Sequence, residues 1–170
     1  MLKYLQYPSL YLIPGIQLLF VAFCRSTLNL KGANSTEVDP NTPYPVVDLL
    51  PEQKAISSKG GTMRLGGHTI YLKKGTRIYD AYKKDKIVER FRHRYHIMRE
   101  YAEKGIEKGL VISSFDETGR IINSIEIKNN KWMVGVQFHP EFKSRPNRPS
   151  PIYYSFIKAA LEHKQKTKRN

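Results

Sequence analysis

A histidine and a glutamate lie two residues apart at the end of the most informative stretch of the chain. His139 and Glu141 follow a mostly apolar run, 132–138, and are separated by Pro140. An imidazole oriented by a carboxylate is a typical general base. Because proline biases the preceding residue to an extended backbone, the run predicts a strand that presents His139 at its carboxyl end. The alternative is a surface histidine and glutamate beside a turn, and spacing alone does not separate the two.

A general base needs a nucleophile, and the chain has one cysteine, Cys24. Apolar residues at helical spacing predict an amphipathic helix from Gly15 to Leu30, with Cys24 among its apolar set. That position favours a buried structural thiol over a reactive one. One cysteine also excludes an internal disulfide and a multi-cysteine metal site. The histidines lack metal-ligand spacing, so we expect no metal.

Two further groups of polar residues suit ligand recognition. Arg92 and Arg94 alternate along a predicted strand, 87–95, and so share one face. Paired guanidinium groups suit a carboxylate or a phosphate, and a solvated strand face is the alternative. Glu37 ends a polar segment that is typical of a capped turn, and its carboxylate also suits an amino group.

Composition narrows the class of protein. The 170 residues carry a net charge of +14, which suits a polyanionic partner or an acidic subunit. The basic residues are scattered apart from the tail, 163–169, so we expect a frayed end rather than a nucleic-acid arm. The apolar N-terminal run is broken by prolines, glycine and Gln17 before it reaches the roughly 20 residues that span a bilayer. We therefore expect a cytoplasmic protein with no nucleic-acid or membrane partner.

Helical and strand patterns alternate along the chain and predict an α/β domain. We expect no strand before the first helix, and three parts: a divergent segment 1–14, a main domain 15–163 and a basic tail 164–170. A linker is expected at 53–61. The predicted helices span 15–30, 78–82, 98–108 and 151–163, and the predicted strands span 46–50, 62–64, 68–72, 87–95, 110–114, 121–127 and 132–138.

Four segments, 33–39, 60–66, 92–95 and 136–146, together resemble the C-terminal glutaminase domain of CTP synthase, a class I glutamine amidotransferase. The resemblance runs from Gly15 to Leu161. It implies an open, mostly parallel sheet flanked by helices, here lacking its first strands. It also implies a part in pyrimidine nucleotide biosynthesis, where glutamine supplies ammonia for the ATP-dependent amination of UTP to CTP.

The resemblance implies partners and roles as well. The partners are L-glutamine and a synthase domain, absent here, that uses ATP and magnesium; this chain itself needs no cofactor, and the family is homo-oligomeric. His139 resembles the general base and Glu141 its orienting partner. Glu37 and Arg94 resemble the residues that hold the amino and carboxylate groups of glutamine, and Gln17 resembles a glutamine-binding position.

The nucleophile is where the sequence departs from the family, whose elbow reads Gly-Ile-Cys-Leu-Gly-Met-Gln. Aligning residues 15–17 on its last three positions places Ile13 at the cysteine and Pro14 just after it. Proline has no N–H for the oxyanion hole, and the upstream glycine loop that supplies the second donor is lacking. Cys24 lies eleven residues on, about 16 Å along a helix. The segment 96–98, His-Ile-Met, also replaces the usual Glu-Val-Asn. We therefore predict no glutaminase activity.

Alternatives remain open at this point. The chain is also consistent with a non-catalytic glutamine-binding or synthase-docking module, an inert gene fragment, or a basic nucleic-acid binder with salt-sensitive binding. Because similarity stops just upstream of Gly15, we expect a truncated or frame-disrupted gene, or a start placed inside a longer reading frame. Sheet edges left open by missing strands would lower solubility.

Overall fold

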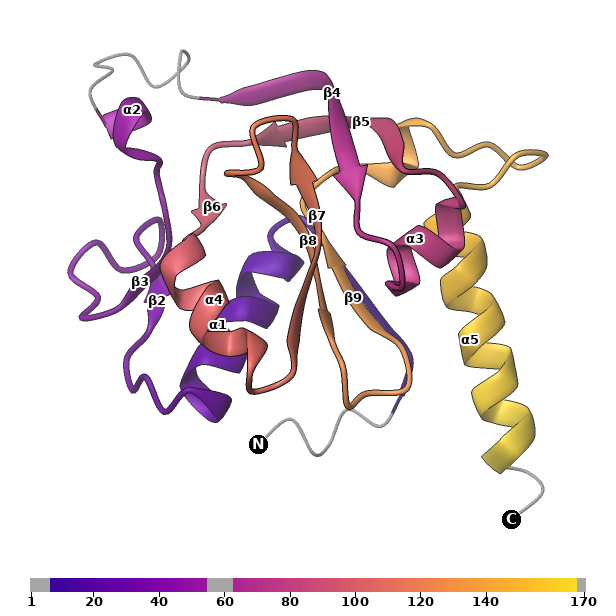
Figure 1. Cartoon of the computed structure of the whole chain (residues 1–170), viewed down its shortest axis with the longest axis horizontal. Coiled ribbons are helices and arrows are strands. Elements are labelled where there is room, and N and C mark those ends of the chain that lie inside the picture. Colours follow the sequence, from indigo (N-terminus) through magenta and orange to yellow (C-terminus); the bar gives the residue numbers. More distant parts are fainter. Residues whose placement is uncertain (1–6, 55–62, 168–170) are drawn as a thin grey trace.

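A six-stranded sheet forms the centre of the molecule in the computed structural model, which describes residues 7–54 and 63–167 (Figure 1). The strand order is β1-β9-β8-β7-β4-β5. The strands span Ser9–Leu12 (β1), Met133–Val136 (β9), Ile122–Ile127 (β8), Leu110–Asp116 (β7), Arg64–Leu72 (β4) and Lys86–His93 (β5).

Helices cover both faces of this sheet. Helices α1 (Gly15–Thr27) and α4 (Arg99–Ile106) pack on one face, and α3 (Arg77–Tyr82) and α5 (Pro151–Thr167) lie on the other (Figure 1). A small second sheet, β2-β3-β6, lies beside α1. Its strands span Asn34–Ser35, Pro45–Asp48 and His96–Ile97, and the short helices α2 and η3 span Pro51–Lys54 and Pro140–Phe142.

The predicted α/β class is correct, but the prediction of a mostly parallel sheet was wrong for the residues described. Within the six-stranded sheet, only β1 and β9 pair in parallel, and the other neighbours are antiparallel. The reason is local: β7, β8 and β9 follow one another through tight turns, and a short connection can join only antiparallel strands. The sheet is therefore mixed.

The absence of a strand before the first helix was also wrongly predicted. Residues Ser9–Leu12 form β1, which pairs with β9 from Ser9↔Met133 to Leu12↔Val136. Each residue of β1 is only half-buried, and Pro8 and Pro14 bracket the run. Such a short strand carries little periodic signal and forms here because the neighbouring strand supplies its hydrogen bonds.

Other predicted boundaries moved by a few residues. The first helix ends at Thr27, before the predicted Leu30, and the chain turns through a left-handed Asn29. The predicted strands 62–64 and 68–72 form one strand, β4, although Thr62 lies outside the described residues. The linker predicted at 53–61 begins inside α2, and its residues 55–61 also lie outside the described part. The last helix continues to Thr167, so the start of the predicted frayed tail is helical.

Alternate residues of β9 face two separate hydrophobic cores. Met133 packs with the apolar face of α1, whereas Val134 and Val136 pack with α3, α5 and Phe138. Gly135 lies where α1 crosses the strand, and a Cβ atom there would be 2.9 Å from Ile16 Cγ1 and 3.3 Å from Ile16 Cα. The glycine thus permits the close approach of α1 to β9 that fixes the position of the turn before α1.

Candidate active site

The turn between β1 and α1 contains the position predicted for the missing nucleophile. Ile13 follows the last residue of β1, and Pro14 is the N-cap of α1, with φ −58° and ψ −3°. The Pro14 carbonyl accepts a hydrogen bond from the Leu18 N–H at 3.0 Å, which begins the helix. A strand, a tight turn and a helix therefore surround Ile13, which is the order of elements in a nucleophile elbow.

His139 leaves the sheet at the same edge. The ladder between β1 and β9 ends at Leu12↔Val136, and parallel strands have their carboxyl ends on one side. The backbone N–H of Gln137 donates to the Asn123 carbonyl at 2.9 Å, and that of His139 donates to the Arg90 carbonyl at 2.8 Å. The segment after β9 is thus held between β8 and β5, on the side of the sheet edge that also carries Ile13.

The predicted contact between His139 and Glu141 is present. His139 Nδ1 lies 2.5 Å from Glu141 Oε1, because the short helix η3 turns the chain immediately after His139. A carboxylate at Nδ1 favours the tautomer with the proton on Nδ1 and leaves Nε2 as an acceptor. The Nε2 atom is buried and has no hydrogen-bond partner among the described residues. This arrangement suits a general base.

Two aromatic side chains that the sequence did not single out hold this pair. The His139 ring stacks on Phe142, with ring centroids 4.9 Å apart. Tyr153, on the first turn of α5, lies with its hydroxyl 3.5 Å from Glu141 Oε2. Burial and the Glu141 carboxylate raise the pKa of Tyr153, so its hydroxyl stays protonated and can donate to Glu141. No motif announces these contacts, because they depend on how η3 and α5 meet.

A pocket of about 270 Å³ brings together the other predicted residues. Its lining includes Ile13, Gln17, Glu37 and Arg94, which come from separate parts of the chain. His139 and Glu141 are not among the described residues that line it. The remaining lining residues are Pro14, Met63, Arg92, His93 and Tyr95. The predicted residues therefore fall into two groups. One group lines a polar pocket that includes Ile13, and the other is the base His139 with its partner Glu141.

The pocket contains side chains of both charges, which suits the ammonium and carboxylate groups of an amino acid. Glu37 is exposed, and its carboxylate makes no ion pair with any residue in the described part of the chain. Its backbone N–H donates to Ser35 Oγ at 3.2 Å, which fixes the turn. Arg92 and Arg94 both line the pocket, although β5 ends at His93. The Gln17 side chain is buried and donates to the Tyr95 carbonyl at 3.1 Å.

Two buried histidines lie close together at the pocket wall, and one of them, His93, lines the pocket. The rings of His93 and His96 are 4.7 Å apart, and His93 Nδ1 lies 3.0 Å from the Tyr95 carbonyl. Burial lowers the pKa of His93 to about 3, with smaller contributions from His96, Arg64 and His139. Burial likewise lowers the pKa of His96 to about 4, so both rings are neutral near pH 7.

Cys24 has the structural role predicted for it. Its side chain is fully buried in the core between α1 and the sheet. Burial raises the pKa of the thiol to about 12, so the nucleophilic thiolate is not formed near neutral pH. Cys24 therefore does not replace a nucleophile at position 13.

Two absences concern the described residues alone. Within 7–54 and 63–167, no group of three or more histidine, cysteine or acidic side chains is placed to hold a metal ion. No helix in those ranges is both long enough and apolar enough to cross a bilayer.

Comparisons with known proteins agree with this geometry. Residues 14–159 match the family model of glutamine amidotransferase class-I. A CTP synthase from Clostridium acetobutylicum is 49% identical over 152 residues, which are 89% of this chain and 28% of the relative. One from Pyrococcus abyssi is 47% identical over 159 residues, 93% of this chain and 30% of the relative. The chain thus spans less than a third of these relatives.

The solved structures include one of similar fold. The glutaminase domain of Trypanosoma brucei CTPS with bound acivicin has a TM-score of 0.86 and 30% identity, and the match covers 95% of this chain and 62% of that one. The match of the family model over most of the chain, together with the strand–turn–helix elbow and the His139–Glu141 pair, leads to one conclusion. The chain belongs to the class-I glutamine amidotransferases and is similar to the glutaminase domain of CTP synthase.

Proposed function

We propose that this chain binds L-glutamine in the pocket beside Ile13 but does not hydrolyse it at a rate typical of a glutaminase. The observation that carries the proposal is that Ile13, Gln17, Glu37 and Arg94 line one pocket. The Glu37 carboxylate pairs with the ammonium group of glutamine, and the Arg94 guanidinium pairs with its carboxylate. The pocket is close to the lower limit of volume for small-molecule sites.

Catalysis is lost at two neighbouring positions. In this family fold, a thiolate at the elbow attacks the amide carbon and a base returns the proton to the leaving ammonia. Isoleucine at position 13 supplies no nucleophile, and Pro14 supplies no N–H to the oxyanion. His139 retains its orienting carboxylate but has no thiol proton to accept. Loss of such a nucleophile costs several orders of magnitude in rate.

A role in CTP formation is the broader part of the proposal. The CTP synthases that match this chain are more than three times its matched length, so their synthase activity involves parts that this chain does not align with. We infer that the chain acts together with a synthase unit that uses ATP and UTP, as a glutamine-sensing or docking subunit. This reading predicts that glutamine binding is retained without ammonia release.

Calorimetry with L-glutamine and an assay for released ammonia test the proposal on the purified chain. We expect saturable binding of L-glutamine, weaker binding of D-glutamine, and no ammonia above background. Glu37→Gln removes the charge that pairs with the amino group and is expected to weaken binding about tenfold. Asp39→Asn is the matched control, because Asp39 lies in the same turn but does not line the pocket.

Two results would contradict the proposal. Absence of glutamine binding at millimolar concentration would identify the pocket as an inert remnant. Ammonia release that is abolished by His139→Ala would demonstrate a nucleophile that the elbow does not contain.

A further inference from the structure

A second and larger cavity, of about 680 Å³, lies at the opposite end of β5 from the glutamine pocket and shares no lining residue with it. It is bounded by the start of β5, the end of α3 and the segment that leads from η3 into α5. Figure 1 shows these elements together at the edge of the sheet where β5 is the last strand. The volume is within the range of small-molecule sites.

Four cationic side chains surround this cavity: Lys84, Lys86, Lys143 and Arg148. Neither Lys84 nor Lys86 is within ion-pair distance of an acid in the described ranges, and Asp85 between them pairs with Lys74. Lys143 Nζ lies 4.0 Å from Glu89 Oε2 and donates to the Val88 carbonyl. The excess of positive charge favours an anion.

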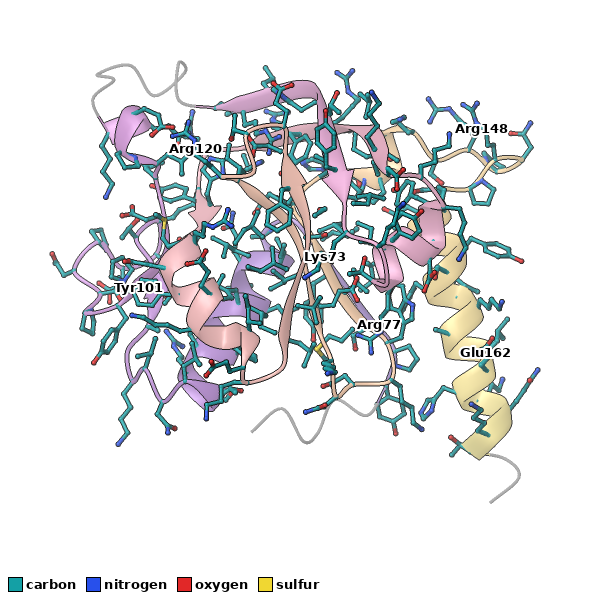
Figure 2. All side chains as sticks on the ribbon, in the orientation of Figure 1. Lys73, Arg77, Tyr101, Arg120, Arg148 and Glu162 are labelled. Atoms are coloured by element: carbon teal, nitrogen blue, oxygen red, sulfur yellow. The ribbon has the colours of Figure 1, made fainter. Side chains whose placement is uncertain are left out.

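Arg148 is held on a defined turn. Its backbone N–H donates to the Arg145 carbonyl at 3.0 Å, and the Arg145 N–H donates back to the Arg148 carbonyl at 3.1 Å. Figure 2 shows Arg148 on this segment, at the β5 end of the molecule. Residues Ser150 and Pro151, where α5 begins, also line the cavity. The positive end of a 17-residue helix therefore adds to the field of the four cations.

A buried carboxyl group lies at the wall of the cavity. Glu89 is 3% exposed, and its Oε1 accepts a hydrogen bond from the Tyr82 hydroxyl at 3.1 Å. That hydroxyl lies 3.4 Å from Ser150 Oγ. Glu89 Oε2 is buried and has no hydrogen-bond partner among the residues described. A buried polar atom without a partner is costly, so a ligand group that pairs with it is favoured.

The group that best completes this site is a hydroxyl. Burial raises the pKa of Glu89, while Lys143 and Tyr82 oppose the shift. A hydroxyl can donate to the carboxylate and can also accept from the protonated acid, so it pairs with Glu89 in either state. The cavity also has an apolar part of its lining, formed by Ile87, Val88 and Pro149.

We propose that this cavity binds a small phosphate monoester of a polyhydroxy compound, such as a sugar phosphate. The phosphate contacts Lys84, Lys86 and Arg148, and a hydroxyl of the same molecule reaches Glu89. The inference is independent of glutamine binding, because the two pockets share no residue.

Calorimetry on the purified chain tests the site with ribose 5-phosphate, inorganic phosphate and ribose as probes. We expect ribose 5-phosphate to bind at least tenfold more tightly than phosphate, and ribose not to bind. The double variant Lys84→Gln/Lys86→Gln removes two charge-assisted contacts and is expected to weaken the binding of ribose 5-phosphate at least tenfold. Lys31→Gln, an exposed lysine outside the cavity, is the matched control and is expected to bind like the parent.

Glu89→Gln separates the hydroxyl contact from the charge. It is expected to reduce the preference for ribose 5-phosphate over phosphate while phosphate binding persists. If this variant fails to fold, the lysine variants and the three probes still test whether the cavity binds a sugar phosphate. The proposal is overturned if ribose 5-phosphate does not saturate the chain at millimolar concentration, if phosphate binds equally well, or if Lys31→Gln has the same effect as the double variant.

Binding of a single-stranded oligonucleotide tests whether the phosphate that the cavity binds belongs to a nucleic acid instead of a small molecule. Oligonucleotide binding that is tighter than that of ribose 5-phosphate, with the same dependence on Lys84 and Lys86, would replace the small-molecule site by a nucleic-acid surface. L-glutamine binding is expected to be unchanged in the lysine variants, so failure of this site and failure of the glutamine pocket are separate results.

Discussion

The base side of the candidate site, His139 and Glu141, and the elbow side, Ile13 and Pro14, are positioned by adjacent parallel strands but differ in the chemistry of their side chains. On the base side, the imidazole and the carboxylate are 2.5 Å apart, and the backbone of His139 is bonded to β5. On the elbow side, the path of strand, turn and helix is present, but the residue at the turn is aliphatic.

The difference shows that the backbone path of the turn and the reactivity of the side chain at the turn depend on different residues. The path of the elbow depends on the β1–β9 ladder and on the packing of α1 against Gly135. Neither depends on a thiol. The fold therefore does not require a nucleophile at position 13, whereas the contact between His139 and Glu141 depends on the two side chains themselves. Predictions that alter each side in turn test this separation.

The largest expected effect comes from restoring the elbow. The double variant Ile13→Cys/Pro14→Leu supplies a thiol and a backbone N–H, and we expect ammonia release from glutamine to rise by about two orders of magnitude or more over the parent chain. A stopped assay for ammonia measures the rise. The single variant Ile13→Cys is expected to gain less, because Pro14 still lacks the oxyanion donor.

The dependence of this gain on His139 is the control. Adding His139→Ala to the restored variant is expected to remove most of the new activity, since the thiol would lose its base. If the double variant gains no activity although it binds glutamine, the elbow has moved relative to the base, and the separation of backbone and chemistry described above is wrong.

An intermediate effect is expected from pH, through the histidines beside the pocket. Burial lowers the pKa of His96 from 6.5 to about 4, so below pH 6.5 the unfolded chain binds a proton that the folded chain does not. Stability is thus complete above pH 6.5 and falls as the pH falls toward 4, by about 3 kcal/mol for this one ring. His93, whose pKa is lowered to about 3, acts in the same direction.

Denaturant unfolding at pH 7, 5.5 and 4 measures this dependence. His96→Leu removes one titrating ring, and because neither ring nitrogen of His96 has a hydrogen-bond partner in the described residues, the substitution breaks no such bond. We expect a shallower loss of stability between pH 6.5 and 4 in the variant. An unchanged pH dependence would mean that the pKa of His96 is not lowered in the folded protein.

The fold was predictable where single residues mark a boundary. Gly15 and Pro151 begin helices at the predicted residues, and Pro151 suits a first helical position because its missing N–H would have no partner there. Strand β1 could not be predicted, since four half-buried residues between prolines become a strand only beside β9. The direction of the sheet was predicted from the family resemblance, and it was wrong for the described strands, of which β7, β8 and β9 are joined by tight turns and the pairs of β4 with β5 and β7 are also antiparallel.

The candidate site was predictable as a set of residue types but not as a geometry. The motifs indicated His139, Glu141, Glu37 and Arg94, and the structure brings the last two into one pocket. The roles of these residues stay predictions. The supporting contacts join distant parts of the chain, such as Gln17 with the carbonyl of Tyr95. Local spacing carries no signal for such pairs, because they depend on packing between elements.

The smallest of these effects is expected at Gly135, where the elbow and base sides are joined through α1 and β9. Gly135→Ala places a Cβ 2.9 Å from Ile16 Cγ1 and 3.3 Å from Ile16 Cα, so α1 must shift away from the strand. We expect a loss of about 1–3 kcal/mol in the free energy of unfolding and weaker glutamine binding, because Gln17 moves with the helix. Denaturant unfolding and calorimetry measure the two effects.

Gly67→Ala is the matched control, because a Cβ at Gly67 meets only Val88 Cγ1, at an ordinary 3.5 Å. It is expected to change stability by less than about 0.5 kcal/mol and to leave glutamine binding as it is. Equal losses in the two variants would contradict the view that glycine is required at position 135 for the approach of α1. Gly135→Ala could instead lower stability and leave glutamine binding unchanged. In that case the position of Gln17 does not depend on how α1 packs on β9, and glutamine binding depends on the segments that carry Glu37 and Arg94 alone.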